Sequence, residues 1–236
     1  MVLLIYLKET KLYLLKSLPA PVVRFAQMVH VKLQVTLMQH HASSFAIPQP
    51  AFGRPYDFRT TEADNLWKFM GSGGLPGGMF DRVGYPDKVF KNPADWDKVL
   101  QERLALPAEF SITADFEYDS ASNTFTLRAN VLALADISTD AINLTAYLVE
   151  DSIIAPQLDN NVNVTDYVHN HVFRTSFAGT TGEQISSGSF TKNQVLVKSY
   201  TLAANPVWNV KNCSAVVFVR NTVTQEVLEA HHASFH

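Results

Sequence analysis

The spacing of the hydrophobic positions changes near the middle of the chain. Between residues 61 and 104, apolar residues recur every three or four positions, whereas beyond Pro107 they alternate with polar residues. A period near 3.6 predicts amphipathic helices, and a period of two predicts strands with one buried face. The pattern therefore predicts an α/β segment followed by a β-rich segment, with the change near residue 107.

Two short helices are predicted before this boundary. The first begins at Thr61, and Asp64 follows three residues later in the arrangement of a capping box. The second begins at Asn92, with Pro93 at the first helical position and apolar residues at helical spacing from Trp96 onward. Each is long enough to cover part of a sheet but too short to form a core alone.

A glycine-rich stretch, Gly71–Arg82, separates the two helices and holds five of the ten glycines in the chain. It lacks the Gly-Lys-Ser/Thr end of a Walker loop, and its sixth position is Pro76 where a dinucleotide fingerprint requires glycine. The pattern therefore predicts a tight turn that leads into a short strand over Met79–Arg82, and no phosphate loop.

The segment beyond residue 107 reads as strands joined by turns. Ile112–Tyr118 and Phe125–Val131 alternate on either side of the turn Asp119–Asn123, which predicts a hairpin. Five further strands are expected: Ile142–Ile154, Tyr167–Phe177, Gln194–Leu202, Cys213–Asn221 and Glu226–Phe235. Seven alternating strands with no helix between them favour an antiparallel β-sandwich of immunoglobulin-like type.

One of these strands is predicted to lie in the centre of a sheet. Ser214–Val219 is apolar on both faces, which is typical of a strand that is covered on both sides. Cys213 at its start is then expected to be a small buried hydrophobe without reactivity.

Composition excludes several chemistries. The 236 residues are 47% hydrophobic and 17% charged, which is typical of a globular protein with a large core. The single cysteine excludes an internal disulfide, a cysteine-based zinc site and a Cys-x-x-Cys redox pair. The net charge of −3 gives no electrostatic reason to bind nucleic acid. We therefore expect no nucleic-acid partner and no cofactor.

The first 52 residues differ in composition from the rest, with five basic residues, one acidic residue and no Gly, Asp or Asn. Charged residues interrupt both a signal-peptide pattern and a membrane span there. A basic amphipathic helix at a membrane surface would have to end at Pro19. The favoured hypothesis is that residues 1–38 are an atypical start, either misread or disordered.

Histidine supplies the main candidates for metal binding. On a continuous strand, His169 and His171 would project from one face about 7 Å apart, within reach of one metal ion. Asp166 or one residue of the pair His231-His232 would have to complete the site. The favoured interpretation is that His169 and His171 form hydrogen bonds on a sheet surface and that the C-terminal histidines are a solvated end, so that no metal site is assigned.

Nothing in the sequence predicts a catalytic residue. The Gly-x-Ser-x-Gly pattern of a nucleophile elbow is absent. Glu150 and Asp151 are neighbours, so on a strand they face opposite ways rather than forming a pair for acid-base chemistry.

Several segments, taken in order, resemble one family. They are Tyr147–Asp151, Asp166–Arg174, a turn containing Gly179 and Gly182, Trp208–Val219 and Thr224–Ala230. This succession resembles the 28-kilodalton outer-membrane-protein family of Bacteroidetes-type bacteria, clearly over residues 107–236 and less fully over 40–106. The positions that carry the family motifs are Pro76, Tyr167, His169, Asn170, His171, Arg174, Trp208, Asn212 and Cys213.

The resemblance implies an α+β protein with two domains. Residues 39–106 would form a partial thioredoxin-like α/β segment with a cis bond at Leu75-Pro76, and residues 107–236 an immunoglobulin-like β-sandwich. The Cys-x-x-Cys pair found in many thioredoxin-like relatives has no counterpart here. The resemblance also implies a lipoprotein-related protein that is located at the outer membrane or cell surface. No signal peptide and no lipid-acceptor cysteine are recognised at this N-terminus.

We therefore expect a non-enzymatic protein of the outer membrane or cell surface that acts as a binding or adhesion module for a protein or glycan. One alternative is a thioredoxin-like redox or metal-dependent enzyme whose cysteine pair is missing from this chain. The other is a glycan-binding module that uses exposed aromatic residues such as Tyr118 and Tyr147.

Overall fold

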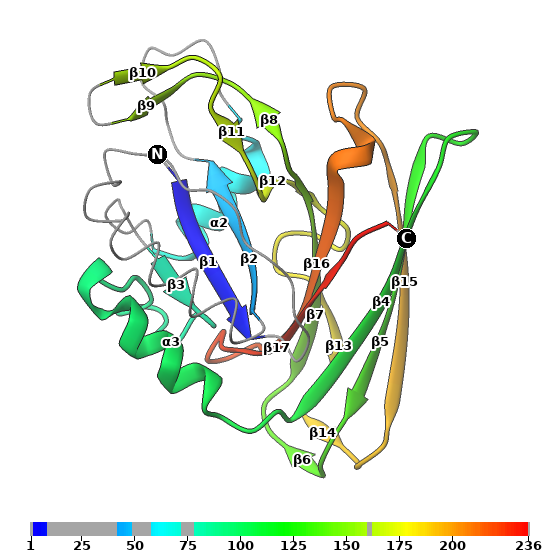
Figure 1. The fold of residues 1–236 in the computed structure, drawn as a ribbon. Helices are drawn as coiled ribbons and strands as arrows, with labels where there is room; N and C mark the ends of the chain where they lie inside the picture. The colour runs from blue at the N-terminus through cyan, green and yellow to red at the C-terminus, as the bar shows by residue number, and fades with distance from the viewer. Residues whose placement is uncertain (1, 9–41, 49–57, 72–77, 160–161, 236) are drawn as a thin grey trace.

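The protein folds into two large β-sheets that pack face to face, with two short helices beside the larger one (Figure 1). The computed structural model describes residues 2–8, 42–48, 58–71, 78–159 and 162–235. In chain order the elements are β1 (Val2–Lys8), β2 (Ala42–Pro48), α2 (Thr61–Phe69), β3 (Gly78–Phe80), η1 (Pro93–Asp95), α3 (Trp96–Leu104), β4 (Phe110–Asp119), β5 (Thr124–Ala133), β6 (Ile137–Ser138), β7 (Ile142–Glu150), β8 (Ile153–Ile154), β9 (Gln157–Asp159), β10 (Val162–Val164), β11 (Val168–His169), β12 (Val172–Ser176), β13 (Glu183–Ser186), β14 (Ser189–Phe190), β15 (Val195–Ala203), η2 (Val210–Asn212), β16 (Cys213–Asn221) and β17 (Val227–Ala233).

The larger sheet has the order β17-β16-β7-β12-β2-β1-β3, and β13 also pairs with β7. Its centre is the antiparallel pair of β7 and β16, which runs in register from Glu150 opposite Cys213 to Ile142 opposite Asn221. Every residue of β16 is buried. The prediction of a strand that is covered on both faces is therefore confirmed.

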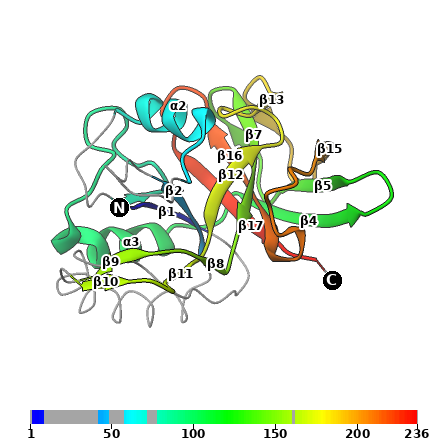
Figure 2. The ribbon, with the colours of Figure 1, turned by 90° about the horizontal axis from the view of Figure 1, so that it is seen from above.

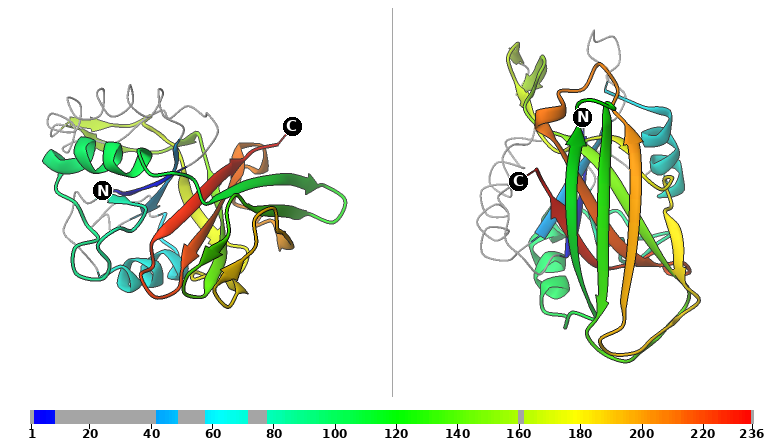
Figure 3. Two further views of the ribbon diagram at one scale, coloured as in Figure 1. Left: turned by 90° about the horizontal axis from the view of Figure 1, so that it is seen from below. Right: turned by 90° about the vertical axis from the view of Figure 1, so that its right-hand side faces the viewer.

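The smaller sheet, β15-β5-β4, covers one face of the larger sheet (Figure 3). Strands β4 and β5 pair from Phe110 opposite Ala133 to Asp119 opposite Thr124, so the predicted hairpin is confirmed. The core between the two sheets combines alternate residues of β4 and β5 with alternate residues of β7 and β16. Its members include Phe110, Phe116, Phe125, Leu127, Leu148 and Val217.

The opposite face of β7 and β16 packs against α2. Leu66 of this helix lies in a second core with Tyr147, Phe173 and Phe218. The helix starts at Thr61, but its capping residue is Thr60 and not Thr61 as predicted, because the Thr60 hydroxyl accepts the cap hydrogen bond from the Ala63 amide at 3.0 Å. The second predicted helix begins with the short 3₁₀ turn η1 and continues as α3.

The larger sheet contains strands from both sides of residue 107. Strand β12 pairs in parallel with β2 through Val172 and Ala46, and β1 pairs with both β2 and β3. Helices α2 and α3 lie on opposite sides of β1 and β2 (Figure 2). The architecture is thus mostly antiparallel β-structure with few helices, and the N-terminal strands extend a sheet of the sandwich.

Some predictions fall on residues that the structure does not describe. These are residues 9–38 of the atypical start predicted over 1–38, the cis bond at Leu75-Pro76 and the position of Pro76 itself, whereas residues 2–8 of that start form β1. A cis peptide bond is present at Tyr85-Pro86. None of the described helices is long and apolar enough to cross a membrane.

Two glycines in the loop between β12 and β13 allow a matched test of packing. Both have positive φ, +76° at Gly179 and +68° at Gly182, so alanine at either position costs about 1–2 kcal/mol of backbone strain. A Cβ at Gly182 would also lie 2.2 Å from the Leu144 carbonyl oxygen, whereas one at Gly179 meets nothing within 4 Å. We expect Gly182→Ala to reduce the free energy of unfolding by roughly 1–3 kcal/mol more than Gly179→Ala.

Urea unfolding followed by circular dichroism measures this difference. Equal losses in the two variants would show that the loop does not approach β7 as closely as described.

Candidate functional site

Apart from Pro76, which lies outside the described residues, the positions of the family motifs gather where β7 ends and β12 and β16 begin. Glu150, the last residue of β7, is only 4% exposed. Its Oε2 accepts a hydrogen bond from Arg174 Nε at 2.8 Å, and its Oε1 accepts one from the Asn209 amide at 2.9 Å. Through the Asn209 amide, Glu150 therefore fastens the loop between β15 and β16, which carries the Trp-Asn and Asn-Cys motifs, to the centre of the sheet.

Asp151 holds the neighbouring turn. Its Oδ1 lies 3.2 Å from Nδ1 of His171 and also accepts the His171 amide. The Asn170 side-chain oxygen accepts the Ser152 amide at 2.8 Å. These contacts join the turn after β7 to the turn before β12, so Asn170 and His171 shape the backbone here.

His169 and His171 do not lie on one continuous strand, contrary to the expectation. His171 has a positive φ of 54°, so β11 ends at His169 and β12 starts only at Val172. His169 Nε2 lies 3.3 Å from the Ala155 carbonyl oxygen, and its ring packs edge-on against Tyr167. Within the described part of the chain, no three His, Cys, Asp or Glu residues cluster as a metal site would require.

The C-terminal histidines also differ from the prediction of a solvated end. His231 and His232 belong to β17, and both are half-buried because β17 pairs with β16. His232 Nε2 lies 2.9 Å from the Ser214 hydroxyl, and its ring lies 6.4 Å from that of His171.

Cys213 is 3% exposed, as expected for a buried thiol at the start of a central strand. Burial, reinforced by the charge of Glu150, raises the pKa of the thiol to about 12. A thiol that stays protonated is a poor nucleophile, so this cysteine serves as a core residue.

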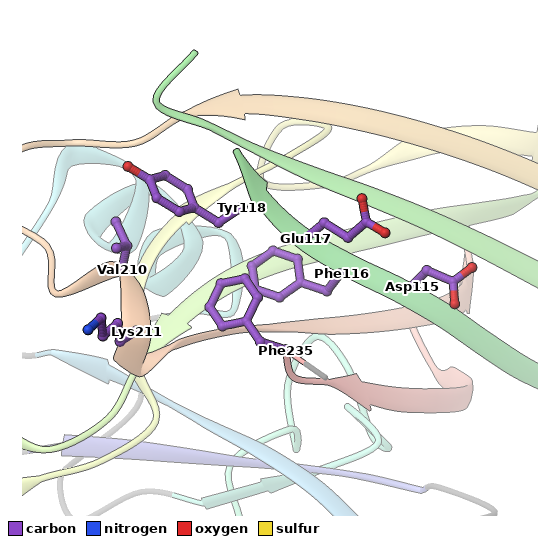
Figure 4. Close-up of a pocket in the computed structure, with 7 residues that line it drawn as sticks. All are labelled: Asp115, Phe116, Glu117, Tyr118, Val210, Lys211 and Phe235. Carbon is purple, nitrogen blue, oxygen red and sulfur yellow. The ribbon is translucent and has the colours of Figure 1, made fainter. Parts of the chain in front are cut away.

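A groove opens where the smaller sheet separates from the loop after β15 (Figure 4). Its volume is about 640 Å³. One side is β4 and the other is η2 with the end of the chain beyond β17. The lining residues are Asp115, Phe116, Glu117, Tyr118, Val210, Lys211 and Phe235.

Aromatic rings form the base of this groove. The rings of Phe116 and Phe235 stack with centroids 4.7 Å apart, and Phe125 stacks beneath Phe116. Tyr118 and Phe235 are partly exposed, and the Tyr118 hydroxyl donates to the Asn123 side-chain oxygen at 2.8 Å. The groove therefore offers a rigid aromatic surface to a ligand.

The edge of β4 that borders the groove is open. Among the described strands, β4 pairs only with β5, and the Leu134 amide donates to the Glu109 carbonyl at 2.9 Å. Because hydrogen-bonded and non-bonded pairs alternate in an antiparallel ladder, the even-numbered residues of β4 direct their N–H and C=O groups away from β5. These outward groups include those of Phe116 and Tyr118, and no other described strand pairs with them.

Sequence reasoning identified Tyr118 but missed the rest of the groove. Tyr147, the other aromatic residue predicted to be exposed, is 0% exposed and donates its hydroxyl to the Thr180 carbonyl at 2.6 Å. The prediction for Tyr147 is wrong because β7 is covered on both faces. Phe235, Val210 and Lys211 lie far from β4 in the sequence, so alternation along β4 contained no signal for them.

The fold defines a β-sandwich protein whose larger sheet is extended by N-terminal α/β elements. Residues 63–235 match the family described as outer membrane protein Omp28, and the chain belongs to this family. This match confirms the predicted resemblance and the predicted location at the outer membrane or cell surface.

Two solved structures from Porphyromonas gingivalis are similar to this chain. One is a domain of the outer membrane lipoprotein Omp28, at 22% identity over 56% of this chain and 91% of that one, with a TM-score of 0.37. The other is HBP35, at 14% identity over 72% of this chain and 55% of that one, with a TM-score of 0.55. No curated protein matches the chain.

The Glu150–Arg174 pair predicts a strong effect on stability. Glu150→Gln removes the negative charge and leaves the Arg174 guanidinium half-buried without a counter-ion, so we expect a loss of about 3–5 kcal/mol in the free energy of unfolding. The control is Glu102→Gln, because Glu102 pairs with Lys98 in an exposed contact at 3.8 Å. Loss of this exposed pair should lower the free energy of unfolding by under about 0.5 kcal/mol. Urea unfolding of both variants measures the contrast, and similar small losses would contradict a structural role for the buried pair.

His169 and His171 predict that stability falls with acidity. Burial lowers the pKa of both side chains below the ordinary value of 6.5, although Asp151 opposes the shift at His171. The folded protein then binds fewer protons than the unfolded chain, so the free energy of unfolding decreases as the pH falls below about 6.5. Each histidine contributes a slope of at most about 1.4 kcal/mol per pH unit.

Unfolding midpoints between pH 7.5 and about 5 measure this slope. We expect His169→Gln and His171→Gln each to flatten it and the double variant to flatten it further. An unchanged slope in the double variant would show that other groups control the acid sensitivity.

Proposed function

We propose that this protein is a non-enzymatic binding module of the outer membrane or cell surface, and that it captures an extended peptide segment of a partner protein along β4. The observation that carries this proposal is an unpaired strand edge beside an aromatic groove. An added strand would receive main-chain hydrogen bonds from the outward groups of Phe116 and Tyr118. Strand addition of this kind takes affinity from the main chain and specificity from side-chain pockets.

The two faces of β4 define the chemistry of the peptide. On the groove side, Phe116, Tyr118 and Phe235 favour apolar side chains. On the solvent side, Asp115 and Glu117 are exposed and favour basic side chains on a neighbouring strand. Because side chains of a strand alternate between faces, the preferred peptide alternates apolar and basic residues.

The absence of catalysis is part of the proposal. The chain has one cysteine, and that thiol is buried with a raised pKa, which argues against thiol redox chemistry. The N-terminal elements support a thioredoxin-like origin, since α2 and α3 flank β1 and β2 on opposite sides (Figure 2). The hairpin of β4 and β5 packed on a second sheet supports the immunoglobulin-like assignment.

Fluorescence anisotropy with a labelled peptide of alternating Lys and Val tests the proposal, and a peptide of the same composition with all Lys preceding all Val is the control. The full chain is used because the larger sheet contains strands from both sides of residue 107. We expect the alternating peptide to bind. We expect Ala114→Pro, which removes an outward N–H, and Tyr118→Ala, which removes a groove ring, each to weaken binding by about tenfold.

Ala114→Thr is the matched variant for Ala114→Pro, because it keeps the outward N–H and suits a strand. Its binding should equal that of the wild type. Equal binding of the two peptides, or no effect of Ala114→Pro, would overturn strand addition. Binding to a glycan array without binding to either peptide would replace the peptide by a glycan as the ligand of the module.

A further inference from the structure

Arg82 is a buried cation whose hydrogen-bonding capacity is largely unused. It follows β3 in a turn with a positive φ of 56°, and it is 0% exposed. Its Nη2 donates to the Tyr147 hydroxyl at 3.3 Å, and its guanidinium carbon lies 5.1 Å from the centre of the Phe218 ring. Its Nε and Nη1 are buried and have no hydrogen-bond partner among the described residues.

A second buried arginine lies on the same face of the larger sheet. Arg220 of β16 donates to the Gln225 side-chain oxygen and to the Thr181 carbonyl oxygen, which are both neutral acceptors. Its Nε is also buried without a partner. Burial, followed by the charge of Arg82, lowers the pKa of Arg220 to about 10, which agrees with two cations that lie close together.

The carboxylate next to Arg82 in the chain is already engaged elsewhere. Asp81, next to Arg82 in the chain, accepts from Arg103 Nε at 2.9 Å, and the same Arg103 pairs with Glu226. In the described part of the chain, neither Arg82 nor Arg220 forms an ion pair with a carboxylate. The Tyr147 hydroxyl does not supply a negative charge, because burial raises its pKa.

A buried hydroxyl completes the group. Thr145 of β7 lies directly opposite Phe218 of β16, so its side chain is on the same sheet face as Tyr147 and Arg220. Its Oγ1 is buried without a partner. The loop before β13 covers this hydroxyl, since a Cβ at Gly182 would lie 2.4 Å from it.

We propose that Arg82, Arg220 and Thr145 form a binding site for one small inorganic oxyanion, such as phosphate or sulfate. Two buried guanidinium groups with no carboxylate partner among the described residues carry a large desolvation cost, which an anion would offset. Guanidinium N–H groups match the spacing of oxyanion oxygens and form charge-assisted hydrogen bonds, and the threonine hydroxyl supplies a further donor. The site lies on the face of β7 and β16 away from the smaller sheet, so it is independent of the groove.

Stability measurements on the full chain test this site. The protein is unfolded in urea and refolded in sodium phosphate, sodium sulfate or sodium chloride at equal ionic strength, because the loop before β13 covers the site. A ligand that binds only the folded state raises the unfolding midpoint as its concentration increases. We expect phosphate or sulfate to raise the midpoint above its value in chloride, and native mass spectrometry to show one retained anion.

Three variants assign the effect to the site. Thr145→Val keeps the shape and the charges and should weaken anion binding several-fold, while Arg82→Met should abolish it. Arg82→Met should also match or exceed the wild-type midpoint in chloride, because it removes an uncompensated charge. Arg128→Met, at an exposed position on β5, is the control and should keep the full response to phosphate.

Equal midpoints in phosphate, sulfate and chloride would overturn the proposal, as would a phosphate response retained in Thr145→Val and Arg82→Met. If Arg82→Met does not fold, Thr145→Val decides the outcome. Glycerol 3-phosphate in place of phosphate distinguishes a free anion from the phosphate of a lipid headgroup. A larger stabilisation by the ester than by inorganic phosphate would overturn the assignment to a small inorganic ion.

Discussion

Burial of β7 and β16 on both faces is the constraint on which the rest of the structure depends. Leu148 and Val217 face the smaller sheet, while Tyr147 and Phe218 face α2. Each large apolar side chain buried in this way contributes roughly 1.5–3 kcal/mol, so the central pair stabilises two separate cores at once. Helix α2 and the hairpin of β4 and β5 are held together because each packs on one face of the same two strands.

The same burial decides which polar groups on these strands must be satisfied. Glu150 at the end of β7 meets Arg174 and the Asn209 amide, so its charge is compensated and the loop after β15 is positioned. Arg220 at the other end of β16 meets only neutral acceptors within the described residues. Glu150 on β7 therefore belongs to a structural ion pair, whereas Arg220 on the neighbouring strand belongs to the proposed anion site.

The groove is a consequence of how the two sheets end. The smaller sheet stops at β4, and the larger sheet stops at β17, which lies against β4 without pairing to it. An edge strand beside an exposed aromatic surface invites pairing with another chain unless something blocks it. In this protein the loop that Glu150 fastens forms the opposite wall, so the family motifs shape the groove although they do not line its base.

Alternation along the chain predicts the hairpin of β4 and β5, and the run that is apolar on both faces predicts β16 with its observed bounds, Cys213–Asn221. The single cysteine by itself removed disulfide and dithiol chemistry. Only the tertiary structure decided that Tyr147 is buried and that the edge of β4 is open among the described strands. It also decided that His171 adopts a left-handed backbone conformation and so does not continue the strand of His169. A local pattern reports which face a side chain occupies, whereas the elements that cover each face come from distant parts of the chain and depend on the packing of the whole fold.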